Sequence, residues 1–291
     1  MHMVFNRGSL FRHLETMSEY LELMTRLARE AGGSILDIYG ESDFGIEIKQ
    51  DNSPLTRADL AAHKIIVAGL EKEVPDVPIL SEESTGITWQ ERKNWDRYFL
   101  IDPLDGTKEF ISRNGEFTVN IAYVENGIPT SGVVYVPVKD VMYTGDQSKS
   151  QAAVERDGQS EIIGVRKMDP KQPLTIVASR RHGGEALQTC LDVLKRHFDE
   201  VETTNMGSSL KLCLIAEGKA DLYPRLAPTS EWDTAAAQAV VEAAGGRVVD
   251  VELNPLVYNS KEDILNPYFY VLGDPDFDWL SILDQVRFPS P

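Results

Sequence analysis

The spacing of hydrophobic residues changes twice along the chain, and this change restricts the fold more than any other feature of the sequence. Apolar residues recur every three or four positions over residues 18–39 and again from Thr56 to Val74, a spacing typical of helices that bury one face. Short apolar runs typical of strands follow at 79–80, 97–101, 117–124, 131–136 and 141–143. Two helices followed by a strand meander predict an α+β first part.

The second part of the chain alternates between strand-like and helix-like segments. Strands are expected at 174–178, 201–204, 220–223, 248–249 and 268–272, with helices at 185–197, 209–217 and 232–244. Such alternation predicts an α/β architecture. A polar segment, 145–172, separates the two parts, and Lys171-Gln172-Pro173 marks the boundary. We therefore expect an N-terminal α+β lobe over 18–172 and a C-terminal α/β lobe over 173–291.

The net charge of the chain restricts the classes of partner that it can bind. The 291 residues include 29 Lys and Arg against 46 Asp and Glu, which gives a formal net charge of −17. A basic face is the usual footprint of a nucleic-acid-binding protein, so we expect no nucleic-acid partner. A small anionic ligand remains compatible, because charges farther away than about 8 Å are largely screened at physiological salt.

The remaining composition favours a cytoplasmic protein, with peripheral association at the inner membrane as an alternative. No apolar run reaches about 18 residues, so no membrane span is expected. The two cysteines, Cys190 and Cys213, lie in helix-like stretches without metal-ligand spacing, and we expect free thiols in a core. His182 lies in a predicted strand-to-helix loop, and we expect it to be a solvated histidine.

Three acidic groups each border a stretch that looks buried. They are Ser81-Glu82-Glu83-Ser84, Asp102-Pro103-Leu104-Asp105-Gly106-Thr107 and Glu231-Trp232-Asp233-Thr234. In the second group, proline fixes its own φ, so the turn is stiff and can direct two carboxylates and the Leu104 carbonyl to one point. Such hard oxygen ligands suit magnesium or manganese rather than zinc. The backbone of Gly106 and Thr107 can then approach a phosphate.

Each acidic residue also has a purely structural interpretation. Asp105-Gly106 fits a tight turn, and Asp102 fits a helix cap. Asp233 with Ser230, and Asp59 with Thr56, fit capping boxes at helix starts. Glu83 alone is typical of a surface acid. The combination of the groups, in this order along the chain, favours a shared site.

That combination resembles the inositol monophosphatase-like superfamily of magnesium-dependent phosphomonoesterases, over residues 18–272. Three further stretches are similar to its 3'(2'),5'-bisphosphate nucleotidase branch of the CysQ type. They are Asp105-Gly106-Thr107-Lys108-Glu109-Phe110, Arg113-Asn114-Gly115-Glu116-Phe117-Thr118-Val119-Asn120 and Gly207-Ser208-Ser209-Leu210-Lys211. The resemblance implies a layered αβαβα sandwich with most metal ligands in the N-terminal lobe.

The resemblance also implies residue roles. Two to three Mg²⁺ ions would be held by Glu83, Asp102, the Leu104 carbonyl, Asp105 and Asp233, with Asp102 bridging two ions. The catalytic residues would be Asp59 and Thr107, which orient the attacking water, together with Glu83. Substrate contacts would come from the ligands Glu83, Leu104, Asp105 and Asp233, from the backbone of Gly106 and Thr107, and from Ser208, Lys211 and Arg225 near a second phosphate.

The implied activity is hydrolysis of a small phosphorylated nucleotide, adenosine 3',5'-bisphosphate, to AMP and phosphate, with inhibition by lithium. Alternatives are an inositol monophosphatase or another sugar-phosphate phosphatase, and a non-catalytic metal or nucleotide sensor. A dinucleotide-binding oxidoreductase is disfavoured because the chain lacks both the G-x-G-x-x-G pattern and the phosphate-loop pattern. The sequence leaves monomer and homodimer open. The extension before Ser18 is expected to carry no chemistry.

Overall fold

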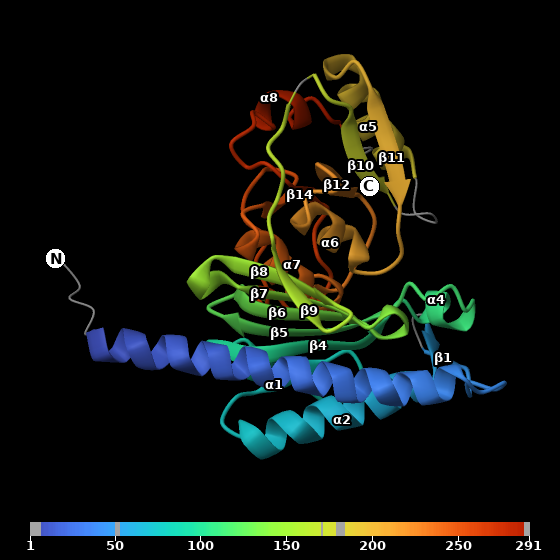
Figure 1. Ribbon diagram of the computed structural model, residues 1–291, viewed down its shortest axis with the longest axis vertical. Helices are drawn as coiled ribbons and strands as arrows, with labels where there is room; N and C mark the ends of the chain where they lie inside the picture. Colours follow the sequence, from blue (N-terminus) through green and yellow to red (C-terminus); the bar gives the residue numbers. More distant parts are fainter. Residues whose placement is uncertain (1–6, 50–52, 170, 179–183, 288–291) are drawn as a thin grey trace.

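The computed structural model describes residues 7–49, 53–169, 171–178 and 184–287, with side chains from residue 18 onward. Its elements are stacked in alternating layers (Figure 1). Helices α1 (Arg7–Tyr39) and α2 (Arg57–Glu73) cover one face of a seven-stranded sheet, and α6 (Leu210–Ala216) and α7 (Ala235–Ala243) lie between that sheet and a five-stranded one. Helices α5 (Glu185–His197) and α8 (Leu280–Leu283) pack beyond the second sheet. The αβαβα order implied by the resemblance is confirmed.

The first two helices follow the predicted pattern with one correction. Helix α1 begins at Arg7 rather than near residue 18, so it extends about three turns before the predicted start. Helix α2 lies where the capping box predicts, because Thr56 and Asp59 make both reciprocal contacts. The N-terminal extension is therefore helical from Arg7, and residues 1–6 lie outside the described part.

The seven-stranded sheet follows the chain in order from β3 to β9. Its strands are β3 (Ile79–Ser81), β4 (Arg97–Asp105), β5 (Thr118–Glu125), β6 (Ile128–Val136), β7 (Val141–Asp146), β8 (Gln151–Arg156) and β9 (Gln159–Ile163). The pairing of β3 with β4 is parallel and every other pairing is antiparallel. In β5, Ile121 faces α1 and α2 whereas Ala122 faces α6 and α7, which explains its continuous apolar run.

The polar segment 145–172 contains two strands, β8 and β9, that the sequence analysis did not predict. All of β9 except Ile163 is exposed because it is the edge of the sheet, so its polar side chains need no core. The turn between the two strands is formed by Asp157 and Gly158, both with positive φ, which is a hairpin signal that polarity obscured.

The five-stranded sheet has the order β11, β10, β12, β14, β13. Its strands are β10 (Leu174–Ala178), β11 (Val201–Asn205), β12 (Leu222–Arg225), β13 (Arg247–Asp250) and β14 (Phe269–Leu272). The pairings of β10 with β11 and β12 are parallel, whereas β14 pairs antiparallel with its neighbours. The predicted alternation is confirmed. Cys190 and Cys213 are buried free thiols, as expected.

Shorter elements complete the fold. A two-stranded sheet consists of β1 (Glu47–Ile48) and β2 (Pro54–Leu55), and the short helices are α3 (Trp89–Arg92), α4 (Thr107–Ile111) and the 3₁₀ turns η1 (Pro137–Lys139), η2 (Gln147–Lys149) and η3 (Glu231–Asp233). Among the described residues, no helix combines the length and hydrophobicity needed to cross a bilayer.

Two glycines allow the middle layer to approach the large sheet closely. A Cβ atom at Gly132 would lie 2.2 Å from the carbonyl oxygen of Ala236, and one at Gly145 would lie 2.6 Å from that of Ala239. Both carbonyls belong to α7, whose alanine-rich face packs on β6 and β7. Glycine in the strands and alanine in the helix therefore set the distance at which α7 and the preceding turn η3 are held.

Candidate metal and phosphate site

The end of β4 holds the first two acidic residues. Pairing between β4 and β5 is irregular between Asp102 and Asp105, where Pro103 interrupts the ladder. The buried Asp102 carboxylate accepts a hydrogen bond from the Leu104 N–H at 3.0 Å through Oδ1. Gly106 follows the strand and has φ +92°, a conformation that glycine adopts without strain. A Cβ there would lie 3.2 Å from the Glu116 carbonyl oxygen.

Asp233 joins these two residues from the other half of the chain. Asp102, Asp105 and Asp233 each offer one oxygen, and these oxygens lie within 4.8 Å of one another. We call these three residues the carboxylate group. Asp233 ends η3 and accepts the Ser230 N–H at 2.8 Å, so it also forms the predicted capping box. The capping interpretation of Asp233 is therefore confirmed, and the same residue lies beside Asp102 and Asp105.

The electrostatics of the carboxylate group favour a bound cation. Burial, followed by repulsion from the neighbouring acids, raises the pKa of Asp102 well above its usual value. Burial and the nearby Asp105 raise the pKa of Asp233 to about 7. A partly buried, oxygen-only set of ligands fits a hard divalent cation, whose charge would relieve this repulsion. The residues present therefore fit the metal that the resemblance implies.

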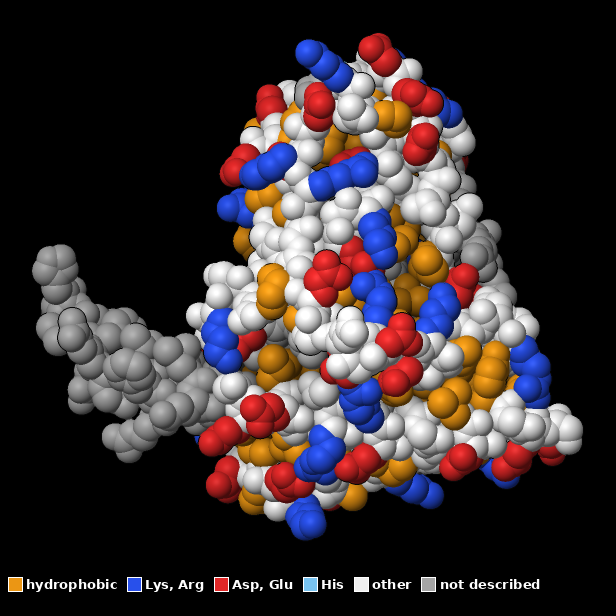
Figure 2. Space-filling model, in the orientation of Figure 1, with side chains coloured by type: hydrophobic (Ala, Val, Ile, Leu, Met, Phe, Trp, Pro, Cys, Tyr) orange, Lys and Arg blue, Asp and Glu red, His pale blue; other side chains and the backbone are white. Residues whose placement is uncertain are grey.

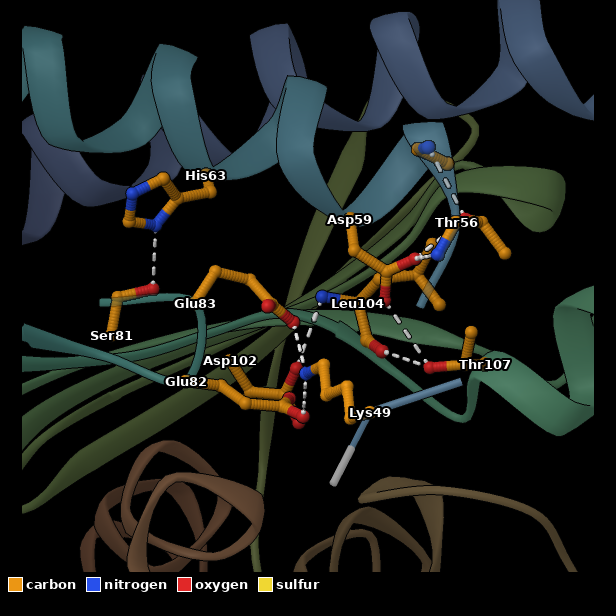
Figure 3. Close-up of polar contacts among 11 residues, drawn as sticks. Lys49, Thr56, Asp59, His63, Ser81, Glu82, Glu83, Asp102, Leu104 and Thr107 are labelled. Carbon is orange, nitrogen blue, oxygen red and sulfur yellow. Dashed lines mark hydrogen bonds and ion pairs between the residues drawn. The ribbon is translucent and has the colours of Figure 1, made fainter. Parts of the chain in front are cut away.

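Glu83 lies outside the carboxylate group and contacts a lysine instead. The Lys49 ammonium lies 2.5 Å from Glu83 Oε1 and 2.8 Å from Glu82 Oε1 (Figure 3). Burial alone would lower the pKa of Lys49, but the two carboxylates raise it overall. The ligand role of Glu83 stays a prediction. No local spacing along the chain indicates a role for Lys49, because its partners are more than 30 positions away.

Asp59 and Thr107 are brought together as the resemblance implies. Asp59 Oδ2 accepts the Thr56 N–H at 2.8 Å and the Thr56 hydroxyl at 2.5 Å. Its other oxygen accepts the Thr107 hydroxyl at 3.2 Å, and that hydroxyl lies 3.4 Å from the Leu104 carbonyl oxygen (Figure 3). Burial is the main cause that raises the pKa of Asp59. Asp59 thus caps α2 and contacts the first residue of α4.

A cavity of about 200 Å³ is lined by two residues of the carboxylate group and by three basic residues, one of which is Lys108. Its lining includes Asp105 and Asp233, which we call its acidic part, and Ser208, Lys211 and Arg225, which we call its basic part. Figure 2 shows Lys and Arg side chains beside a hollow on this face, between the positions that α4 and α6 have in Figure 1. The cavity therefore has acidic and basic parts, both formed by residues named from the sequence.

The basic part of the cavity contains polar atoms without partners. Lys211 is buried, which lowers its pKa to about 8, and its ammonium lies 2.6 Å from the Ser208 carbonyl oxygen. Arg225 donates from Nη2 to the Pro228 carbonyl at 2.8 Å. Within the described part of the chain, Arg225 Nε and Ser208 Oγ are buried without a hydrogen-bond partner. An anion in the cavity would supply acceptors for such donors.

Two further residues beside the carboxylate group had no predicted role. Ser209 donates its N–H to Asp105 Oδ2 at 2.6 Å, and Asn120 Nδ2 lies 2.8 Å from the Ser209 hydroxyl. Both residues lie in motifs that carry the resemblance, but contacts across about 90 to 100 positions have no local signal. His182 lies outside the described residues.

Comparison with known proteins matches most of the chain to one family. The inositol monophosphatase family model matches residues 16–270. The 3'(2'),5'-bisphosphate nucleotidase CysQ of Escherichia coli K12 is 50% identical over 252 residues, which cover 86% of this chain and 98% of that protein. The CysQ protein of Haemophilus influenzae is 35% identical over 267 residues, covering 92% and 98%.

Solved structures agree with the sequence comparisons. The crystal structure of CysQ from Bacteroides thetaiotaomicron, described as a bacterial member of the inositol monophosphatase family, has a TM-score of 0.77 and 44% identity. It covers 87% of this chain and 97% of its own chain. An inositol monophosphatase from Zymomonas mobilis has a TM-score of 0.72 at 26% identity, covering 92% and 98%. From its sequence, its layers and these relatives, this chain belongs to the inositol monophosphatase family.

Proposed function

We propose that this chain is a magnesium-dependent 3'(2'),5'-bisphosphate nucleotidase, which hydrolyses adenosine 3',5'-bisphosphate to AMP and phosphate. The observation that carries the proposal is a single cavity that contains both Asp105 and Asp233 of the carboxylate group and the basic residues Lys211 and Arg225. A substrate with two phosphates would use both parts. The names of the relatives at 35% to 50% identity support the same activity.

The metal would be held at the carboxylate group. Asp102, Asp105 and Asp233, together with the Leu104 carbonyl and Glu83, would bind two to three Mg²⁺ ions. When bound, such ions acidify a water molecule and neutralise charge on the phosphoryl oxygens. Without that neutralisation, the acidic residues would repel a phosphate dianion. We therefore infer that substrate binds to the metal-loaded protein.

Asp59 and Thr107 would guide the attacking water. The Thr107 hydroxyl donates its hydrogen to Asp59 Oδ1. The lone pairs of the Thr107 oxygen can then accept a hydrogen bond from water. The raised pKa of Asp59 favours a role in accepting a proton, since a base is most effective when its pKa approaches the working pH. The backbone of Gly106 and Thr107 would hold the phosphoryl oxygens.

The basic part of the cavity would bind the phosphate that is not hydrolysed. The guanidinium of Arg225 has an unpartnered Nε, and the Ser208 hydroxyl is also unpartnered among the described residues. Arginine matches phosphate geometry, and the Lys211 ammonium adds a charge that burial makes costly without an anion nearby. A monophosphate substrate such as an inositol phosphate would leave these groups unused, which favours the nucleotidase over that alternative.

The test is a phosphate-release assay with adenosine 3',5'-bisphosphate, inositol 1-phosphate and AMP, each with magnesium or with EDTA. We expect release only from the bisphosphate and only with magnesium. Removing a residue that only hydrogen-bonds a metal ligand typically costs about 10- to 100-fold in activity. We expect Asp102→Asn to lose more activity than that, and its circular dichroism spectrum should be unchanged. Faster release from inositol 1-phosphate would support the monophosphatase alternative. Full activity in EDTA would exclude the metal mechanism.

A further inference from the structure

One serine beside the carboxylate group connects the two halves of the chain. Ser209 is buried at the start of α6, whereas Asp105 ends β4. The Ser209 N–H and hydroxyl each lie 2.6 Å from Asp105 Oδ2. The same hydroxyl lies 2.8 Å from the backbone carbonyl oxygen of Asp233. Ser209 therefore contacts two of the three residues of the carboxylate group.

The surroundings of Ser209 direct its hydrogen bonds. Asn120 Nδ2 donates to the Ser209 hydroxyl at 2.8 Å, so the hydroxyl hydrogen is left for Asp105 or Asp233. Asn120 Nδ2 and Thr118 Oγ1 each also lie 3.4 Å from Asp105 Oδ2. All these donors reach Oδ2, and in the described part of the chain none of the assigned hydrogen bonds reaches Asp105 Oδ1.

We propose that Ser209 is a positioning residue for the metal site, an inference that rests on the proposed function. Its hydrogen bonds hold Asp105 Oδ2, which would leave Oδ1 available to a cation, and its hydroxyl also contacts the backbone carbonyl of Asp233. A carboxylate that is free to rotate binds a metal less tightly, because part of the binding free energy is lost in ordering it. Partners of this kind typically change metal affinity by about 10- to 100-fold.

The test is the midpoint of magnesium binding, which is the free magnesium concentration that half-saturates the protein, measured without substrate by isothermal titration calorimetry. Ser209→Ala removes the hydroxyl and keeps the N–H donor. We expect this midpoint to rise by about 10- to 100-fold, while the melting temperature in EDTA stays close to that of the unchanged protein. At saturating magnesium, the phosphatase activity should recover to a large extent.

Two other serines provide matched controls. Ser131 on β6 is fully buried, and its hydroxyl has no partner among the described residues, so Ser131→Ala should leave the magnesium midpoint unchanged. Ser208→Ala should raise the KM for the bisphosphate without moving the midpoint, because Ser208 lies in the basic part of the cavity. The pair Ser208 and Ser209 thus separates substrate binding from metal binding.

The outcomes distinguish this inference from the proposed function. If the unchanged protein binds magnesium and Ser209→Ala has the same midpoint, the positioning role is wrong and the proposed function stands. If Ser131→Ala shifts the midpoint as much as Ser209→Ala does, the effect is a general consequence of core substitution, and the positioning role is again wrong. If the unchanged protein does not bind magnesium, the proposed function fails and this inference fails with it.

Discussion

At the scale of one residue, Lys211 is the side chain that we propose to distinguish a bisphosphate from a monophosphate. Its side chain is buried, and its ammonium contacts the Ser208 carbonyl oxygen. Burial lowers its pKa to about 8, which means that the charged form is destabilised in the free protein. A phosphate placed in the cavity would restore the favourable charge pairing. On the proposed function, Lys211 would therefore contribute more binding free energy to a ligand with a second phosphate than to a monophosphate.

Replacing Lys211 by methionine should test this role directly. We expect Lys211→Met to raise the KM for adenosine 3',5'-bisphosphate by about 10- to 100-fold, since a hydrogen bond to a charged group contributes roughly 1.5–3 kcal/mol. The KM for 3'-AMP, which lacks the 5'-phosphate, should stay unchanged. Thermal stability should stay equal or increase, because a buried charge is removed.

A lysine outside the cavity provides the control for this experiment. Lys219 is exposed and pairs with Glu217, so Lys219→Met should change neither KM. An equal rise in KM for the bisphosphate and for 3'-AMP in Lys211→Met would show that Lys211 does not bind the second phosphate.

At the scale of elements, the packing of α7 on the large sheet determines where Asp233 lies. The helix begins directly after η3, which ends at Asp233, and its backbone rests on Gly132 and Gly145. A methyl group at either glycine would have to displace the helix backbone, not a flexible side chain. The same displacement would move Asp233 relative to Asp105.

Gly132→Ala should therefore destabilise the fold and weaken the metal site together. We expect a loss of about 1–3 kcal/mol in the free energy of unfolding by urea, as is typical of overpacking, and a higher magnesium midpoint. Gly33→Ala in α1 is the matched control, because no atom lies within 4 Å of its added Cβ. That variant should gain about 0.5–1 kcal/mol from helix propensity. A normal magnesium midpoint in Gly132→Ala would show that α7 does not position Asp233.

The sequence predicts well those elements whose buried face is marked by a regular spacing of apolar residues. Helix α5 matches its prediction from Glu185 to His197, because its apolar face repeats at helical spacing. Strands β8 and β9 were not predicted, because β9 is an edge strand whose side chains face solvent. The earlier start of α1, at Arg7, has no acidic residue in its first turn that would indicate it.

The site residues also differ in whether a local sequence pattern predicts them. Local motifs predicted that Asp102 and Asp105 lie together, and the resemblance added Asp59, Thr107 and Asp233. The contacts of Lys49 with Glu83 and of Ser209 with Asp105 depend on how distant elements pack, so no spacing along the chain predicts them.

At the scale of the whole molecule, several acids are buried in a chain that is already strongly acidic. Burial is the largest cause of the raised pKa of Asp102. It also raises the pKa of Asp233 and that of Glu231 to about 7. In the unfolded chain an aspartate has a pKa of about 3.9. Between these values the folded state binds more protons than the unfolded state, so the stability of the metal-free protein falls as the pH rises.

Magnesium should therefore stabilise the protein more at high pH than at low pH. We expect the melting temperature in EDTA to fall from about pH 4 to about pH 7, and the increase caused by magnesium to grow over the same range. Glu231 lies outside the carboxylate group, so magnesium should reduce the pH dependence without removing it. A pH profile of melting temperature that is the same with magnesium and with EDTA would show that the raised pKa values do not belong to a metal site.

The two capping boxes give the site an unusual relation to the fold. Asp59 and Asp233 each stabilise the start of a helical segment with one oxygen, and each also belongs to the proposed chemistry. A cap of this kind contributes about 1 kcal/mol. A lineage that no longer needed the reaction would still be selected to keep both aspartates, or asparagines in their place, in order to fold. Intact acids at these two positions are thus weaker evidence of activity in a distant homologue than an intact Asp102.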